Sequence, residues 1–156
     1  MLLFYARLEM HDAFMRQALA LAEEAQAAGE VPVGAIVVLG NEVVGRGRNS
    51  PIAQNDPTAH AEMLAIRDAC ARVGNYRLEG ATLYSTLEPC IMCAGALVAA
   101  RVTALVFAAR DLRFGGVRSK FRLADSDILN HRVQIVEGVL AVDASRLLQN
   151  FFAPRR

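Results

Sequence analysis

The chain of 156 residues is long enough for one compact domain with a hydrophobic core and short for two. Its 54% hydrophobic and 21% charged residues exclude an intrinsically disordered chain, and no apolar run is long enough to span a bilayer. The net charge of +1 neither favours nor excludes a nucleic-acid partner. The three cysteines, an odd number without paired spacings, exclude a disulfide scaffold and favour a reducing cytoplasm.

The first ten residues, MLLFYARLEM, are apolar but lack the basic start, the long apolar stretch and the small-residue cleavage site of a secretory signal. A helix is expected to begin only after them, with Asp12 as its cap, and to end before Gly29 and Pro32. Residues 1–10 are therefore predicted to be a loose N-terminal extension, or else translation starts at Met10.

Strands and helices alternate through the rest of the chain. Two strands, 33–39 and 42–48, flank Gly40-Asn41, a pair that favours a tight antiparallel hairpin. The later elements are, in chain order, a polar loop over 49–59, a helix of about thirteen residues from His60, a strand over 81–87, a helix from Cys90, a strand over 104–109, a strand over 132–138 and a last helix with the apolar stripe Ala144, Leu147, Leu148, Phe151 and Phe152. This order predicts an α/β fold, a three-layer α/β/α domain with a mixed five-stranded sheet.

Cys90 and Cys93 stand at the predicted start of a helix, in the segment TLEPCIMCAG. The Cys-x-x-Cys spacing places both sulfur atoms on one face, one turn apart, and a helix N-terminus favours thiolates. Two thiolates and one histidine would fill three positions of a tetrahedral zinc site and leave the fourth open for water, as in catalytic zinc sites. The same spacing is also typical of thioredoxin-like redox proteins, and a merely buried pair is a third interpretation. The cysteines alone leave these interpretations open.

His60 and Glu62 lie in the segment DPTAHAEMLAIR, at the predicted start of another helix. A lone His-x-Glu pair is most often an ordinary feature of a helix surface. In a mixed sheet, however, two such helix starts can lie side by side, so that His60 would join Cys90 and Cys93 as a metal ligand. Glu62 would then enter the same site without binding the metal, which is the position that a hydrolytic proton shuttle requires.

The segments HAE at 60–62 and PCIMC at 89–93 resemble the signature of the zinc-dependent nucleoside deaminases. From about residue 12 onward, nearly the whole chain resembles the bacterial tRNA adenosine deaminases. The segments that carry this resemblance are VPVGAIVV, GRGRNSPI, DPTAHAEM, NYRLEGATLYSTLEPCIMCAGAL, FAARD, NHRV and LLQNFF. The resemblance implies a cytidine deaminase-like fold, with residues 1–156 as a single deaminase domain.

The resemblance also implies the roles of the four residues in the predicted site. His60, Cys90 and Cys93 would bind Zn²⁺, one ion per subunit. Glu62 would be the catalytic residue, which takes a proton as water attacks C6 of adenine, passes a proton to N1 and protonates the departing ammonia. The implied activity is hydrolytic deamination of adenosine to inosine at the wobble position of a tRNA anticodon, a step in tRNA processing.

By the same resemblance, Asn49 would hydrogen-bond the target base, and Asp111 would contact the nucleotide backbone beside it. Without the resemblance, both would be plain turn residues. The implied partner is a tRNA anticodon stem-loop, in which the target base is already partly unstacked. An arginine tRNA is the expected substrate. A homodimer in the cytoplasm is also implied, with the small-residue helix 91–101 as the expected interface.

An arginine-rich stretch over residues 110–122, interleaved with Phe114 and Phe121, is expected to supply phosphate contacts and stacking surfaces. The terminal segment FFAPRR is expected to do the same. The stretch also departs from the family, since many members carry small residues of the type Gly-Ala-Ala-Gly-Ser where this chain reads LRFGGVRSKFRLAD. The departure concerns the loop over residues 112–122, which is expected to contact the substrate, and leaves the predicted zinc site unchanged.

His11, Cys70 and His131 match no ligand spacing and are expected to be structural. Three rival functions stay open. Cytosine, cytidine and guanine deaminases share the zinc signature; a structural zinc module that binds RNA would need a fourth protein ligand; and a thioredoxin-like oxidoreductase would remain active without His60.

Overall fold

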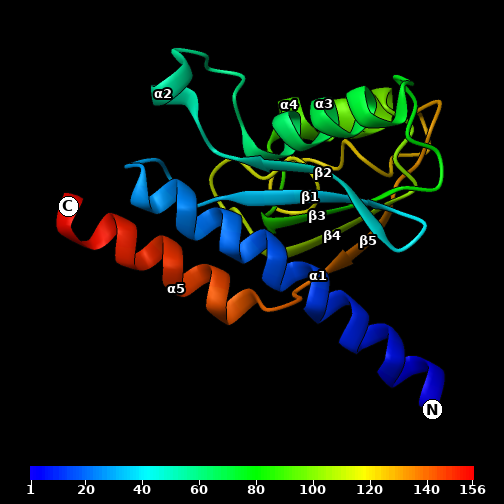
Figure 1. Cartoon of the computed structure of the whole chain (residues 1–156), viewed down its shortest axis with the longest axis horizontal. Coiled ribbons are helices and arrows are strands. Elements are labelled where there is room, and N and C mark those ends of the chain that lie inside the picture. Colours follow the sequence, from blue (N-terminus) through cyan, green and yellow to red (C-terminus); the bar gives the residue numbers. More distant parts are fainter.

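A five-stranded sheet lies between two layers of helices in the computed structural model, which describes all 156 residues (Figure 1). The strands are β1 (Gly34–Leu39), β2 (Glu42–Arg48), β3 (Thr82–Leu87), β4 (Ala104–Ala109) and β5 (Gln134–Glu137). The helices are α1 (Leu2–Ala27), α2 (Pro51–Gln54), α3 (Ala61–Val73), α4 (Ile91–Ala99), α5 (Ala141–Phe152) and a terminal 3-10 turn, η1 (Ala153–Arg155). None of the helices combines the length and the apolar character that crossing a bilayer requires.

The sheet has the strand order β2-β1-β3-β4-β5. β1 runs antiparallel to both β2 and β3, whereas β3, β4 and β5 run parallel to one another. The predicted mixed five-stranded sheet is therefore confirmed. α2 was not predicted, because a single helical turn inside the loop over 49–59 is too short to give a periodic pattern.

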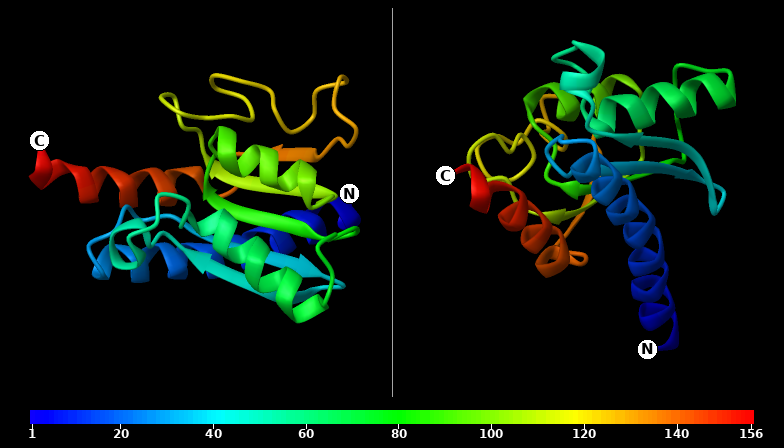
Figure 2. Two further views of the ribbon diagram at one scale, coloured as in Figure 1. Left: turned by 90° about the horizontal axis from the view of Figure 1, so that it is seen from above. Right: turned by 60° about the vertical axis from the view of Figure 1, so that its left-hand side comes forward.

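Helices cover both faces of the sheet, with α3 and α4 on one face and α1 and α5 on the other (Figure 2). The core under α3 and α4 includes Leu83, Leu97 and Phe107. The core under α1 and α5 includes Met15 and Tyr84. Leu83 and Tyr84 are neighbours on β3 and enter opposite cores, as successive strand residues do. The expected three-layer α/β/α fold is confirmed.

The hairpin between β1 and β2 forms as predicted. Gly40 and Asn41 have φ angles of 58° and 63°, and a two-residue turn of type I′ requires positive φ at both positions. The turn pairs Leu39 with Glu42 and Val38 with Val43, and the register shifts by one residue between Val38 and Val37.

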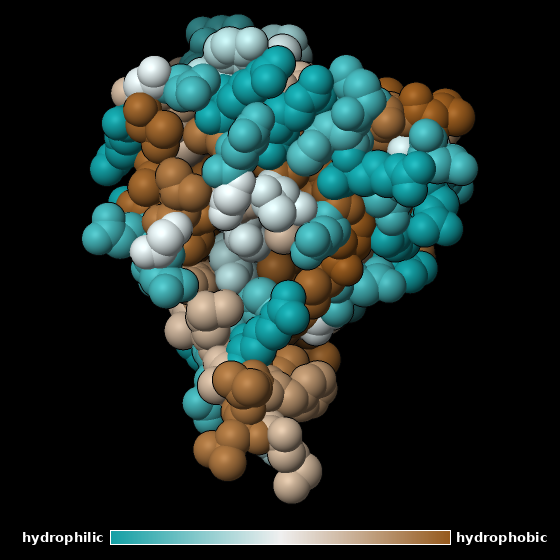
Figure 3. Space-filling model, turned by 90° about the vertical axis from the view of Figure 1, so that its right-hand side faces the viewer, coloured by the Kyte–Doolittle hydropathy of each residue, from teal (hydrophilic) through white to brown (hydrophobic).

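α1 begins at Leu2, so the helix start predicted at Asp12 is wrong. Asp12 is a favourable cap residue, but the segment before it contains neither glycine nor proline and is rich in the helix formers leucine, alanine, arginine, glutamate and methionine. Because nothing stops the helix upstream, Asp12 lies inside it. The side chains of residues 1–10 are exposed, and apolar ones gather at the tip that projects from the molecule (Figure 3).

Deletion of residues 1–9 is expected to change the melting temperature by no more than about 2 °C, because none of their side chains is buried and a total loss of about 0.5 kcal/mol corresponds to about 1–2 °C for a chain of this size. Differential scanning calorimetry of the full and shortened proteins measures this change. A fall of several degrees would show that the segment contributes to the folded domain, contrary to the prediction of a loose extension.

α3 lies directly on the backbone of β2. A Cβ atom added at Gly45 would come within 2.8 Å of the Ala69 amide nitrogen, and one at Gly47 within 2.6 Å of the Ala65 amide nitrogen. Ala61, Ala65 and Ala69 follow one another at helical spacing and are fully buried in this contact. Small residues on both sides thus fix the height of α3 above the sheet, and with it the position of the N-terminus of α3.

Candidate active site

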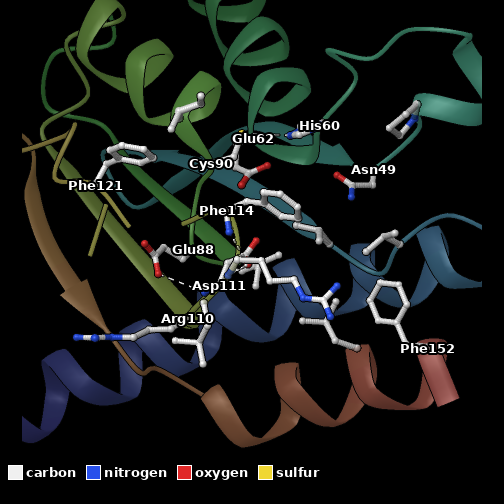
Figure 4. Close-up of a pocket in the computed structure, with 18 of the residues that line it drawn as sticks. Asn49, His60, Glu62, Glu88, Cys90, Arg110, Asp111, Phe114, Phe121 and Phe152 are labelled. Carbon is white, nitrogen blue, oxygen red and sulfur yellow. Dashed lines mark hydrogen bonds between the residues drawn. The ribbon is translucent and has the colours of Figure 1, made fainter. Parts of the chain in front are cut away.

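Two helix N-termini meet beyond the carboxyl end of β3. His60 is the N-cap residue of α3, Cys90 is the N-cap residue of α4, and both have the extended backbone that cap positions adopt. Cys93 follows on the first turn of α4 and is fully buried. The expectation that the two helix starts lie side by side is confirmed (Figure 4).

The spacing of the three side chains fits a zinc ion. His60 Nδ1, Cys90 Sγ and Cys93 Sγ all lie within 4.8 Å of one another, and Nδ1 is 3.6 Å from each sulfur atom. Tetrahedral zinc, with Zn–N of about 2.0–2.1 Å and Zn–S of about 2.3 Å, holds a nitrogen and a sulfur ligand about 3.6 Å apart. No fourth histidine, cysteine or carboxylate joins the cluster, so a zinc ion held by these three side chains would keep one position open for water.

The ionisation of the cluster is suited to a cation. The pKa of Cys90 is lowered to about 4, first by a hydrogen bond from the Cys93 thiol. The same hydrogen bond, together with burial, raises the pKa of Cys93, and a hydrogen bond with Cys90 raises the pKa of His60. A divalent cation between the three groups would replace the shared protons and favour two thiolates and a neutral imidazole.

Glu62 lies on the first turn of α3 and its side chain is only 4% exposed. It points into the same cavity as the cluster (Figure 4) but does not belong to the ligand group. Burial raises the pKa of Glu62 to about 7. A carboxyl group that titrates near neutrality can both accept and release a proton, as a proton shuttle must.

The cluster lies on the wall of a cavity of about 880 Å³. The loop after β2 contributes Asn49 and Pro51, the loop after β4 contributes Asp111 and Phe114, and the end of α5 contributes Phe152. The structure thus brings Asn49 and Asp111 to the same cavity as His60, Glu62 and Cys90 (Figure 4), while Cys93 is buried behind the cavity wall.

Asn49 is held in one orientation by α3. Its Oδ1 accepts a hydrogen bond of 2.9 Å from the backbone N–H of Ala61. This contact satisfies a free N–H at the start of α3, which receives no side-chain cap from His60. Because the oxygen of Asn49 is occupied, its NH₂ group remains to donate into the cavity.

Asp111 organises the loop after β4. Its Oδ1 accepts hydrogen bonds of 3.0 and 3.1 Å from the backbone N–H groups of Arg113 and Phe114. The turn role that its sequence position suggested is therefore present in the structure. The turn also carries the exposed ring of Phe114 to the cavity.

Three arginines of the stretch 110–122 form ion pairs within the molecule, and one of them, Arg122, lies 3.5 Å from Asp125. Arg110 forms a bidentate ion pair with Glu137, and Arg118 forms one with Asp125, which together hold the pKa values of both carboxyl groups below their usual range. These arginines are therefore not the free phosphate contacts that the sequence suggested. Arg113 forms no ion pair and lines the cavity.

The terminal aromatic residues differ from each other. Phe151 is buried, and the guanidinium of Arg155 lies 3.8 Å from the centre of its ring. Phe152 is 41% exposed, and Phe152, Arg155 and Arg156 line the cavity. Of the two rings, Phe152 is thus the one open to a ligand.

The residues set aside as structural lie outside the cavity. His11 Nδ1 is 2.9 Å from the hydroxyl oxygen of Tyr84, and His131 Nε2 is 2.6 Å from the carbonyl oxygen of Val102. Cys70 has no metal-ligand partner. The residue that the sequence did not single out is Glu88, a buried carboxylate on the cavity wall directly before Pro89 and the cysteine pair.

A family model of the cytidine and deoxycytidylate deaminase zinc-binding region matches residues 8–109. The tRNA-specific adenosine deaminase of Haemophilus influenzae is 46% identical over 151 residues, which make up 96% of this chain and 87% of that protein. The chain belongs to the tRNA-specific adenosine deaminase family. Membership decides between the interpretations of the cysteine pair in favour of zinc and against a thioredoxin-like redox protein.

Solved structures separate this deaminase from a rival. A structure from work on A-to-I editing by tRNA:A34 deaminases at the wobble position of transfer RNA is 40% identical, with a TM-score of 0.84 over 87% of this chain and 99% of that chain. A guanine deaminase of Bacillus subtilis is 43% identical, but its TM-score is 0.62 and the match covers 64% of each chain. The similarity to the tRNA deaminase therefore extends over more of the molecule.

Proposed function

We propose that this deaminase hydrolyses adenosine to inosine at the wobble position of a tRNA anticodon. The observation that carries the proposal is the placement of Glu62, a buried carboxyl group, in one cavity with His60 and Cys90, two of the three side chains spaced for zinc. The names of the relatives, tRNA-specific adenosine deaminase and tRNA:A34 deaminase, support the choice of substrate.

His60, Cys90 and Cys93 hold the metal, one ion per chain. Zinc held by three protein ligands lowers the pKa of water from about 15.7 to about 7, which supplies a nucleophile at neutral pH. The two cysteine thiolates offset the charge of the ion, and the N-termini of α3 and α4 stabilise those thiolates.

Glu62 moves the protons of the reaction. Its carboxylate takes a proton from the attacking water, which adds to C6 of adenine, and delivers that proton to N1. It then takes the remaining proton of the new hydroxyl group and gives it to the amino group on C6, which departs as ammonia. One water is consumed, and adenosine becomes inosine. Glu62 is buried at the cavity wall and is not a member of the ligand cluster, so its carboxyl group is left to act in turn as base and acid.

Asn49 and Asp111 position the nucleotide. The free NH₂ group of Asn49 donates to an acceptor atom of the target base. Asp111 contacts the nucleotide backbone beside that base through the oxygen that its own turn leaves free. The exposed rings of Phe114, Phe121 and Phe152 provide stacking surfaces for neighbouring bases at the rim of the cavity.

Replacement of Arg113 by glutamate is expected to weaken binding of an anticodon stem-loop by about tenfold. The slope of log affinity against log salt concentration is expected to decrease by the equivalent of about one to two phosphate contacts. The physical reason is that Arg113 is exposed, unpaired and on the cavity rim. Fluorescence titrations at several salt concentrations measure both effects. Arg77→Glu is the matched control, because Arg77 is also exposed but lies before β3, at the end of that strand remote from the site. Equal affinities of the two variants for the stem-loop would show that Arg113 does not contact the RNA.

The enzyme is proposed to act in the cytoplasm as a homodimer on an arginine tRNA. The exposed face of α4 consists of Ile91, Gly95 and Ala99, which are apolar or small enough for two copies to approach closely. Multi-angle light scattering at micromolar concentration is expected to give twice the chain mass of 16.9 kDa. A mass of one chain would contradict the dimer.

The deciding experiment incubates zinc-loaded protein with an anticodon stem-loop that carries adenosine at the wobble position. Nucleoside mass analysis is expected to detect inosine with the wild type, and none with Glu62→Ala or with a loop that carries cytidine at that position. The similarity to a guanine deaminase makes free guanine the second substrate to test. Deamination of guanine without inosine formation in the stem-loop would replace the proposed function by that one.

A further inference from the structure

Glu88 joins β3 to the segment that carries the cysteine pair, and its side chain is only 1% exposed. Its carboxylate accepts hydrogen bonds of 2.8 to 3.2 Å from the backbone N–H groups of Asp111, Val117, Arg118 and Ser119. It also accepts one from the Ser119 hydroxyl group. All of these donors belong to residues 111–119, which we call the substrate loop.

The charge of Glu88 has no cationic partner. No arginine, lysine or histidine forms an ion pair with it. A buried carboxylate without a cation is costly unless several donors stabilise it, and hydrogen bonds to a charged acceptor are stronger than neutral ones. The donors on the substrate loop are therefore what makes a buried charge tolerable at this position.

The substrate loop also touches the backbone beside Glu88. The N–H of Gly116 donates a hydrogen bond of 2.8 Å to the carbonyl oxygen of Pro89, and Gly115 forms an isolated antiparallel bridge with Cys90. A Cβ atom at Gly115 would overlap the Glu88 carboxylate and come within 2.6 Å of the Asp111 carbonyl oxygen. The loop is thus docked on the segment that supplies a zinc ligand, without room for a larger residue at the contact.

We infer that Glu88 is a positioning residue for the RNA substrate. It fixes the substrate loop beside the cavity, where Asp111 and Phe114 line the wall together with Glu62 (Figure 4). These two residues would then face a nucleotide held beside Glu62. Glu88 does not join the zinc cluster. This inference rests on the proposed function, which supplies the RNA substrate. Through the hydrogen bonds of Glu88, the segment that carries the cysteine pair sets the geometry of the RNA contacts.

Glu88→Gln tests this role, because glutamine keeps the size of the side chain but turns an NH₂ group toward N–H donors. The zinc-loaded variant is expected to retain one zinc per chain and to raise KM for the stem-loop by about ten- to a hundredfold. Its kcat is expected to change by less than about threefold, since Glu62 and the metal ligands are untouched. Amide exchange at Val117, Arg118 and Ser119 is expected to accelerate by about tenfold or more.

Two further variants keep the test decisive. Ser119→Ala removes one donor and is expected to change KM and amide exchange in the same direction by about two- to fivefold; it decides the question if Glu88→Gln does not fold. Asp68→Asn is the matched control, since Asp68 also accepts a backbone N–H bond, from Arg46 at 2.9 Å, but lies outside the cavity. It is expected to leave KM and loop exchange unchanged.

The outcomes separate this inference from the proposed function. Unchanged KM and unchanged loop exchange in Glu88→Gln and Ser119→Ala would overturn the inference, and so would a loss of kcat at unchanged KM. If the wild type formed no inosine, the proposed function would fail. The exchange comparison needs no substrate, and it would then decide alone whether Glu88 holds the loop.

Discussion

Glu62→Gln is expected to lower kcat for inosine formation by at least about a thousandfold, because one positioned acid–base group contributes about 10²–10⁴-fold and Glu62 carries each proton transfer of the proposed reaction. Glutamine is similar in size but has no proton to exchange. Single-turnover measurement of inosine at saturating enzyme reports the chemical step directly. Zinc per chain and the affinity for the stem-loop are expected to stay within about twofold of the wild type.

The control for this prediction is a change of the same chemical kind at a distance from the cavity. Asp68→Asn also replaces a carboxylate by its amide, and it is expected to leave kcat unchanged. The melting temperature of Glu62→Gln should not fall, because the substitution removes a charge that is buried at 4% exposure. A Glu62→Gln enzyme that keeps a tenth of the activity with zinc bound would mean that another group carries the protons.

Removal of zinc is expected to abolish activity and to destabilise the protein. A ligand that binds only the folded state stabilises it by about 4 kcal/mol when its free concentration is a thousandfold above Kd, which corresponds to roughly 8–16 °C for a chain of this size. Calorimetry with excess zinc and then with a chelator measures the difference. Cys93→Ala, which deletes a buried member of the proposed ligand set, is expected to contain less than about a tenth of a zinc per chain and to show no response to the chelator.

The third cysteine of the chain provides the control. Cys70 is outside the cluster, so Cys70→Ala is expected to retain one zinc per chain, wild-type activity and the full shift with chelator. A Cys93→Ala protein that kept both zinc and activity would exclude the proposed ligand set. A disulfide between Cys90 and Cys93 in the active enzyme would return the redox interpretation.

Features that depend on neighbouring residues could be predicted from the sequence. The Gly40-Asn41 turn needs positive φ at two adjacent positions, and few residue pairs supply that. The starts of α3 and α4 were predicted within one residue, because His60 and Cys90 stand where a loop or strand pattern changes to a helical one. The start of α1 was predicted wrongly at Asp12. An N-cap residue marks the start of a helix only if the residues before it oppose helix formation, and those before Asp12 do not.

Apart from the meeting of His60 with the cysteine pair, which the signature indicated, side-chain contacts between distant residues could not be predicted. The sequence shows Arg110 and Arg118 as two members of a basic stretch, but only the fold brings Glu137 to one and Asp125 to the other. Glu88 is the clearest case, because its hydrogen-bond donors lie 23 to 31 residues further along the chain. A lone glutamate before a proline carries no signal of that connection.

The contact of α3 with Gly45 and Gly47 gives this enzyme an asymmetric tolerance to mutation. The residues in that contact can hardly be replaced by smaller ones, since their side chains are already a hydrogen atom or a methyl group. Enlarging one lifts the helix and displaces His60 and Glu62 together. Random mutagenesis of this helix–strand contact should therefore yield folded but inactive variants rather than variants with gradually reduced activity. Selections for altered substrates should accumulate changes in the loops after β2 and β4 and leave the contact unchanged.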